Sequence, residues 1–395
     1  MKYVAVMGDA KLNLTTDIVL HYFNDYLASM GEPTTSKAWT LFQINKHFKK
    51  LIKGSKEIKK KYGNKKLFID SGGFQIIVGY INQSRVKEYI DSYHFILNKY
   101  SNDIDYIFSL DIMNKGWNRN TLIKLNDYSM DSSIKLIQKK LELKDKQLFI
   151  VHTRTLPVFE LWKELMTKHE IYKYYERYSF GGLVGLKKET NAKFSHFVPF
   201  TFWLIQQVLN NKGKIKHIHM LGQSSRLAIF TSIILEKIFK EKFNLNIEIT
   251  MDSSELMRFT KIDQKLPILT KINNEYILIN ETNQIPEAIQ KMNLNEKEKE
   301  LAKIGKIDNE LFIELVSQNI YYSIELGHKL FDNFNLNELL NLKKDNLKEL
   351  HFIFEKGRIA QELENNLEIM KKMVSYLESN DNNIEKKCID ILKNY

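Results

Sequence analysis

Acidic and histidine side chains stand at the ends of several apolar runs of this sequence. Asp70 ends KLFID, Asp111 ends YIFSLD and Asp252 ends IEITMD, while His152 ends QLFIVH. A carboxylate can attack an electrophilic carbon, and a second carboxylate or a histidine can move a proton. The chain therefore offers groups for covalent or acid–base chemistry, provided that the fold brings them together.

A turn rich in small residues follows the first of these acids. After Asp70 come Ser71, Gly72, Gly73, Phe74 and Gln75. Two glycines let the backbone turn tightly and approach a ligand closely, and the phenylalanine offers a flat face to a planar base. Taken alone, the motif is also typical of a simple tight turn.

Apolar runs alternate with helical stretches along the chain. The candidate strands are 3–8, 40–44, 66–70, 106–111, 147–152, 179–185, 217–222 and 247–252, of which 40–44 is the weakest. Helical spacing of apolar residues is clear between them, as at 86–100 and 131–143. Eight strand–helix units predict an α/β fold, a (β/α)8 barrel, with a doubly wound parallel sheet as the alternative.

Polar or glycine residues recur at the strand ends. Besides the acids and His152, Gly182 and Gly222 close their runs, and successive end residues lie 30 to 41 residues apart. The carboxyl ends of barrel strands form one rim, where active sites of such barrels lie. His217 and His219 alternate along one run, so we expect only one to face the interior, in a structural role.

Composition bounds the class of protein. Hydrophobic residues make up 43% of 395 residues, enough for a large core, and no apolar run is long enough to span a membrane. No signal peptide is evident, so a cytoplasmic location in a bacterium or a phage-infected host is expected.

The single Cys388 excludes an internal disulfide. The net charge of +11 favours a polyanionic partner, unless it is spread over solvated faces.

The chain changes character near residue 281. We expect a barrel catalytic domain over 1–280 and a mainly helical region over 281–395 packed on the barrel. The charged segment 335–395 is either a helical cap or a basic platform for a nucleic-acid backbone.

Five segments together resemble the tRNA-guanine transglycosylase superfamily over about residues 60–330. They are FIDSGGFQ at 68–75, SLDI at 109–112, FGGLVGL at 180–186, HIHMLG at 217–222 and ITMDSS at 249–254. The resemblance implies a pentosyltransferase that exchanges guanine in a polynucleotide for a free 7-deazaguanine base, such as 7-cyano-7-deazaguanine, through a covalent glycosyl-aspartate.

The resemblance also implies residue roles. Asp252 matches the nucleophile and Asp70 the second carboxylate, a proton shuttle. Asp111 would accept hydrogen bonds from the base. The other matched base-binding residues are Ser71, Gly72, Gly73, Phe74, Gln75, His152, Gly182 and Leu183.

The sequence departs from the family in three places. No cysteine lies between 252 and 387, and Gln318 stands where a zinc-ligating histidine is usual, so we expect neither a metal nor a cofactor. His152 replaces a base-reading glutamine, and the residues after MDSS lack the usual continuation.

Without zinc ligands, the sequence most resembles the DNA-guanine transglycosylases of phages and bacteria, so DNA is the expected partner. tRNA exchange, a non-catalytic nucleic-acid-binding homologue and, more weakly, a metal-dependent barrel hydrolase are the alternatives. No membrane partner is expected, and the chain could form a homodimer.

Overall fold

The structure, a computed structural model, describes most of the chain. The described residues are 1–8, 14–29, 41–77, 79, 81–114, 116–181, 197–223, 225–253, 268–272, 274–279, 309–354 and 359–393. Within them, strands and helices alternate as far as Ser253.

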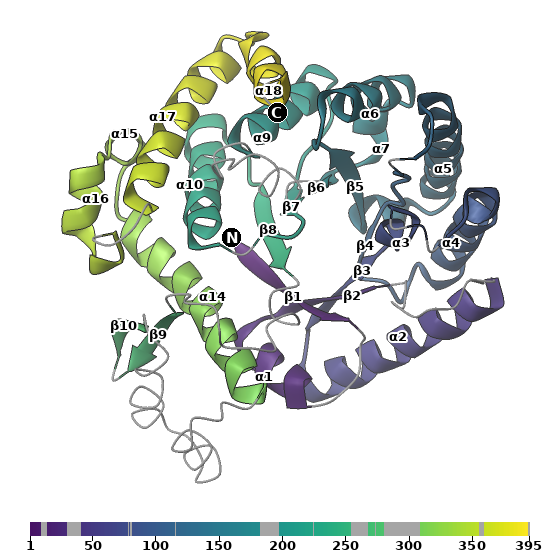
Figure 1. Ribbon diagram of the computed structural model, residues 1–395, viewed down its shortest axis with the longest axis horizontal. Helices are drawn as coiled ribbons and strands as arrows, with labels where there is room; N and C mark the ends of the chain where they lie inside the picture. Colours follow the sequence, from purple (N-terminus) through teal and green to yellow (C-terminus); the bar gives the residue numbers. More distant parts are fainter. Residues whose placement is uncertain are drawn as a thin grey trace.

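Eight parallel strands close into a barrel (Figure 1). They are β1 (Lys2–Gly8), β2 (Asp25–Ser29), β3 (Lys66–Asp70), β4 (Tyr106–Phe108), β5 (Gln147–His152), β6 (Arg177–Gly181), β7 (His217–Met220) and β8 (Glu248–Ser253). Each strand pairs with the next one, and β8 returns to β1, where Val4 lies opposite Asp252. The predicted (β/α)8 barrel is confirmed, and the doubly wound alternative is wrong.

Both faces of these strands are buried, which explains their nearly continuous apolar runs. Side chains alternate between the faces of a strand. One set fills the barrel interior: Val4, Leu27, Phe68, Tyr106, Phe108, Leu148 and Ile150. The alternate set, which includes Ile69 and Ile107, belongs to the larger core that the helices share. The interior is therefore a packed core, and a ligand can enter only at an end of the barrel.

A ring of helices surrounds the strands. It contains α1 (Leu14–Tyr22), α2 (Leu41–Tyr62), α3 (Gly73–Ile77), α4 (Val86–Tyr100), α5 (Arg119–Lys139), α6 (Leu156–Lys168), α7 (Ile171–Tyr174), α9 (Phe197–Asn210), α10 (Arg226–Phe243) and α14 (Asn309–Phe331), with short 3₁₀ turns at Gln83–Arg85 and Leu141–Asp145. Side-chain caps start two of them: Asn118 accepts from the Thr121 amide at 2.8 Å, and Ser225 accepts from Ala228 at 3.3 Å.

Helix α14 packs against both α1 and α10, between which it lies in Figure 1. It thus takes the eighth place in the helical ring, although it follows residue 280. The domain boundary at residue 280 stays a prediction.

The last helices lie outside this ring. They are α15 (Leu336–Leu340), α16 (Lys344–Leu350), a 3₁₀ turn at Phe352–Phe354, α17 (Ile359–Glu378) and α18 (Asn383–Lys393). Helix α17 packs on α9 and α10, and α18 packs on α9 and α6 (Figure 1). Residues 335–395 contain ten lysines and arginines against eleven acids. Because these charges nearly cancel, the segment does not have the composition of a basic platform.

The second strand was predicted in the wrong place. Residues 41–62 form helix α2, and the strand is Asp25–Ser29, of sequence DYLAS. Ile44 of TLFQI belongs to a helical stripe, because Ile44, Phe48 and Leu51 are buried at intervals of three or four residues. The strand itself has only five residues, too few for a clear periodic signal.

The strand ends also differ from the predicted ones. Strand β4 stops at Phe108, three residues before Asp111, and β7 stops at Met220, two residues before Gly222. An antiparallel hairpin, β9 (Ile268–Ile272) with β10 (Glu275–Ile279), was not predicted. None of the helices in the described residues is long and apolar enough to cross a membrane.

Candidate active site at the barrel rim

The carboxyl ends of the strands bring the predicted acids together. Asp70 ends β3, Asp111 follows β4, and Asp252 lies at the end of β8. The charges of Asp111 and Asp252 both act on Asp70, and each helps to raise its pKa. Three carboxylates from distant parts of the sequence thus lie near one another at the carboxyl end of the barrel.

Asp252 is held firmly through one of its two oxygens. Its Oδ1 accepts the Gly222 amide at 2.8 Å and lies 3.1 Å from Nε2 of His219. Gly222 has a φ of +73°, a backbone conformation that favours glycine, and this turn aims its N–H at the carboxylate. The other oxygen, Oδ2, makes no hydrogen bond with the described residues. The residue is buried, with 7% of its surface exposed, so Oδ1 is held in place while Oδ2 is left without a partner among the described residues.

A buried series of hydrogen bonds between β7 and β8 holds His219, the partner of Asp252. His219 Nδ1 lies 2.7 Å from the Thr250 hydroxyl, and His217 Nε2 lies 2.6 Å from the same oxygen. The carboxylate only accepts, so His219 donates from Nε2 and, when neutral, accepts at Nδ1 from Thr250. The threonine hydroxyl has a single proton, so His217 donates to it. Burial lowers the pKa of His217 well below its usual value, which keeps that ring neutral.

This arrangement corrects the expectation for the two histidines. Positions 217 and 219 are two residues apart, so their side chains lie on the same face of β7 and both contact Thr250. Both rings are fully buried. His219 therefore touches a carboxylate of the site and does more than fill space.

Asp70 has a raised pKa. Burial, and after it the charge of Asp111, raises the pKa of Asp70 to about 6. Two hydrogen bonds oppose the shift: Ser29 Oγ donates to Oδ2 at 3.1 Å, and the Gly72 amide donates to Oδ1 at 3.3 Å. A carboxyl group with a pKa near neutrality can both give and take a proton under physiological conditions.

The predicted glycine turn after β3 has the expected tight geometry. Gly72 has a φ of +82°, which an L side chain rarely adopts. The Ser71 carbonyl accepts the hydroxyl of Tyr89 at 2.7 Å, which fixes the turn to α4. The Ser71 side chain is fully buried and its hydroxyl finds no partner among the described residues.

Asp111 and His152 form a close pair. His152 Nε2 lies 2.5 Å from Asp111 Oδ2, and both residues are buried. The imidazole also lies edge-on to Trp162, with ring centres 4.7 Å apart. A Cβ at Gly181 would meet His152 at 2.9 Å, so glycine there leaves room for the ring. The pair presents a polar edge that could hydrogen-bond a planar ligand.

Gly73 leaves room for the Asp111 carboxylate. A Cβ at this position would lie 2.2 Å from Asp111 Oδ1 and 2.8 Å from the Asp111 carbonyl oxygen. The first residue of α3 and the segment after β4 therefore approach each other this closely only because residue 73 has no side chain.

We expect Gly73→Ala to displace Asp111 and to destabilise the protein by about 1–3 kcal/mol, the usual cost of overpacking. Thermal unfolding monitored by circular dichroism measures the loss. Gly116→Ala is the matched control, because the nearest atom to its Cβ, Asn114 Oδ1, is 3.4 Å away. Equal melting temperatures for the two variants would contradict the expected clash.

Four of the predicted base-binding residues lie wholly or partly outside the described part of the chain. The backbone of Phe74 and Gln75 lies in helix α3, but their side chains are outside the described part of the chain. Gly182 and Leu183 also lie outside the described residues. The stacking role of Phe74 and the main-chain contacts of residues 182 and 183 stay predictions.

Sequence reasoning missed several residues that hold the acids. Ser29 was missed together with its strand, and Thr250 was hidden inside an apolar run. The Gly222 amide is a backbone group, which no sequence pattern reveals. Of these residues, only His219 could have been recognised from the sequence, because a histidine in a buried strand requires a polar partner.

Gln318, at the expected position of a zinc ligand, has other partners. Its Oε1 accepts the Thr270 hydroxyl at 2.6 Å, and its Nε2 lies 3.0 Å from the Tyr22 hydroxyl. Among the described residues, no cluster of three or more histidine, cysteine, aspartate or glutamate side chains could hold a metal. The absence of zinc stays a prediction.

Comparison with known proteins identifies no family. No protein-family model matches the chain, and no curated protein matches its sequence. The fold therefore defines the class: the protein is a (β/α)8 barrel. Such barrels are commonly enzymes, and their active sites lie at the rim where Asp70, Asp111 and Asp252 meet.

Proposed function

We propose that the protein exchanges a guanine base in DNA for a free 7-deazaguanine base. One observation supports this most directly: Asp252 is oriented with one oxygen free, beside Asp70, whose pKa is raised to about 6. A nucleophilic carboxylate next to a proton-carrying carboxyl group is what base exchange at a glycosidic carbon requires.

In the first step, Asp252 Oδ2 attacks C1′ of the target nucleotide. The new C–O bond forms as the bond from C1′ to N9 of guanine breaks, and the electron pair goes to the base. Asp70, when protonated, supplies the proton that neutralises the departing guanine. The His219 and Gly222 hydrogen bonds to Oδ1 hold the carboxylate in line for this attack.

In the second step, the incoming 7-deazaguanine gives its N9 proton to Asp70. Its nitrogen then attacks C1′ and displaces Asp252, which regenerates the free carboxylate. Two inversions at C1′ leave the sugar configuration unchanged. Asp70 ends protonated and ready for the next cycle, so the protons balance over the reaction.

The paired Asp111 and His152 are suited to reading the base. Because Asp111 Oδ2 is engaged by His152, the pair would act as one unit, with the carboxylate accepting from base N–H groups and the imidazole oriented by it. The resemblance of the strand-end motifs to guanine transglycosylases supports guanine as the leaving base, and the missing zinc ligands favour DNA over tRNA.

The test is exchange of labelled guanine into single-stranded DNA, duplex DNA and tRNA in parallel. We expect label in DNA, and incorporation of 7-cyano-7-deazaguanine when that base is added, measured by mass spectrometry of the nucleosides. A duplex must release the target base from its stack, so single strands should react faster. Label in tRNA alone would overturn the choice of DNA. No exchange in any of the three would overturn the enzymatic proposal and favour a non-catalytic nucleic-acid-binding protein.

A further inference from the structure

Helix α2 concentrates the basic charge of the protein. Its 22 residues contain eight lysines and a single acid, Glu57. The lysines are Lys46, Lys49, Lys50, Lys53, Lys56, Lys59, Lys60 and Lys61. This helix therefore contributes a surplus of seven positive charges to a chain whose net charge is +11. The C-terminal helices, whose charges cancel, contribute none of that surplus.

The lysines are arranged on one side of the helix. Ile44, Phe48, Ile58 and the pair Leu51 and Ile52 are buried against the barrel. Six lysines at helical spacing form the opposite side, which we call the lysine face: Lys46, Lys49, Lys50, Lys53, Lys56 and Lys60. From the first to the last, this face extends about 21 Å along the helix.

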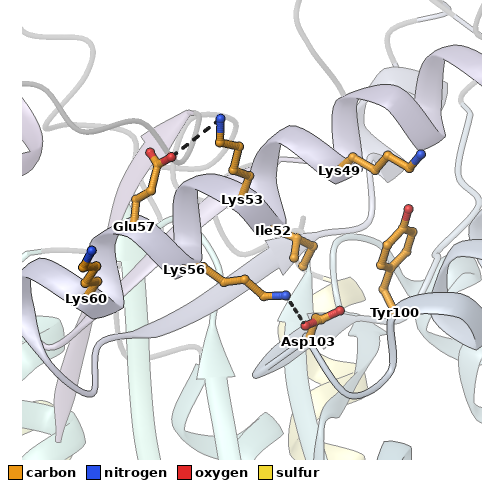
Figure 2. A pocket seen from close by; sticks show the side chains of 8 residues that line it. All are labelled: Lys49, Ile52, Lys53, Lys56, Glu57, Lys60, Tyr100 and Asp103. Carbon is orange, nitrogen blue, oxygen red and sulfur yellow. Dashed lines mark ion pairs between the residues drawn. The ribbon is translucent and has the colours of Figure 1, made fainter.

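Part of the lysine face borders a groove. Lys49, Lys53, Lys56 and Lys60 line a hollow of about 430 Å³ together with Tyr100 and Asp103, at and beyond the end of α4 (Figure 2). On α4, the Lys99 ammonium lies over both the Tyr100 ring and the ring of Phe95, which is 44% exposed. A basic groove lined by an aromatic ring, here that of Tyr100, is a combination that binds single-stranded nucleic acids.

Acids compensate only part of this charge. Lys56 pairs with Asp103 at 2.8 Å, and Lys53 lies 3.9 Å from Glu57. The other four lysines of the face form no ion pair with any residue that the structure describes: Lys46, Lys49, Lys50 and Lys60. These four ammonium groups are exposed and available to phosphates.

The beginning of α2 is close to the candidate active site. His47 Nε2 lies 3.0 Å from the Ser29 carbonyl oxygen, and the Ser29 hydroxyl donates to Asp70. The lysine face thus begins next to the strand end that carries a reacting carboxyl group and leads away from it. A single-stranded polynucleotide with one nucleotide at the barrel rim could place its neighbouring phosphates on this helix.

We propose that the lysine face of α2 binds the phosphate backbone of the polynucleotide substrate. The inference takes the identity of that polymer, DNA, from the proposed function. An anionic membrane is the less suitable partner, because the apolar side chains of α2 whose burial the structure describes face the barrel and leave nothing to insert between lipids.

The test compares two variants with the same loss of charge. In the first, Lys46, Lys49, Lys50 and Lys60 are changed to Gln. In the matched control, the exposed lysines Lys372, Lys386, Lys387 and Lys393 of α17 and α18 are changed to Gln. Binding of a fluorescent single-stranded oligonucleotide is measured by anisotropy between 50 and 300 mM salt, and melting temperatures verify that both variants fold.

Each phosphate contact contributes about 0.7 to the slope of log K against log salt for a single strand. We therefore expect the α2 variant to lose about 3 units of slope and the control variant to keep the slope of the unaltered protein. Equal slopes in the two variants would overturn the inference. The inference would also be overturned if the protein bound phosphatidylserine vesicles through α2 but did not bind the oligonucleotide.

The same binding measurement separates this inference from the proposed reaction. An unchanged slope in a protein that exchanges guanine would overturn only the role of α2. A slope that depends on α2 in a protein without exchange would overturn only the reaction. Gly73→Ala, which alters the pocket and not the helix, should leave the salt slope unaltered.

Discussion

Replacing Asp252 with asparagine is expected to abolish base exchange, with a loss on the order of 10⁴-fold or more in rate. An amide oxygen is too weak a nucleophile to attack C1′, so no covalent intermediate forms. The amide can still accept the Gly222 N–H, so the site should keep its shape. Oligonucleotide binding and its salt dependence should stay the same, because Asp252 touches neither a phosphate nor helix α2.

Trapping of the intermediate measures this directly. The unaltered protein, mixed with DNA in the absence of an incoming base and then denatured, should give a protein–DNA adduct on a denaturing gel, whereas Asp252→Asn should give none. Asp25→Asn is the matched control, because Asp25 is a buried strand aspartate at the opposite end of the barrel. Full exchange by Asp252→Asn would refute the nucleophile assignment.

Replacing Asp70 with asparagine is expected to have two opposite effects. Exchange should fall by about 10²–10⁴-fold, the usual contribution of a proton-transferring group. Stability near neutral pH should rise, because the variant no longer buries a charge beside Asp111 and Asp252. An amide at this position can still accept from Gly72 and donate to Ser29, so the local structure has no reason to collapse.

The sign of the pH dependence follows from the direction of the pKa shift. The carboxyl of Asp70 has a pKa of about 6 in the folded protein and 3.8 as the ordinary value, so the folded state holds this proton more tightly. Below pH 3.8 the group is protonated in both the folded and the unfolded state and does not change the free energy of unfolding. As pH rises from about 4 to 6, folding loses up to about 3 kcal/mol, and the loss is constant above that range.

Thermal unfolding of the two proteins at pH values from 4.5 to 7.5 measures this effect. The advantage of Asp70→Asn in melting temperature should grow through pH 6 and then level off. Asp25 also has a pKa raised to about 6 by burial, but it is present in both proteins and cancels in the difference. An advantage that is the same at every pH would contradict the raised pKa of Asp70.

The barrel was predictable because its strands are buried on both faces. Runs such as KLFID and QLFIVH are almost uninterrupted in apolar residues, and the helices between them show clear periodicity. Where this signal was weak, the prediction failed. Five residues, DYLAS, form the second strand, and a longer apolar stripe nearby belongs to helix α2.

The sequence by itself determined which polar side chains close the apolar runs, although β4 stops three residues before Asp111. It also determined that lysines accumulate in one segment, 46–61. Asp70, Asp111, His152 and Asp252 were proposed as site residues in this way, and their position at one end of the barrel follows from the rule that parallel strands end at a common rim.

Only the tertiary structure decided how these groups are held and charged. Closure of the barrel places Thr250 opposite His219 in the register of β7 and β8, which builds the hydrogen-bond chain beneath Asp252. It places Ser29, from a strand 41 residues earlier, on the carboxylate of Asp70. The pKa of Asp70 depends on burial and on two distant charges. Hydrogen bonds and Coulomb interactions act over distances of a few ångströms in space, and separations in the sequence do not specify those distances.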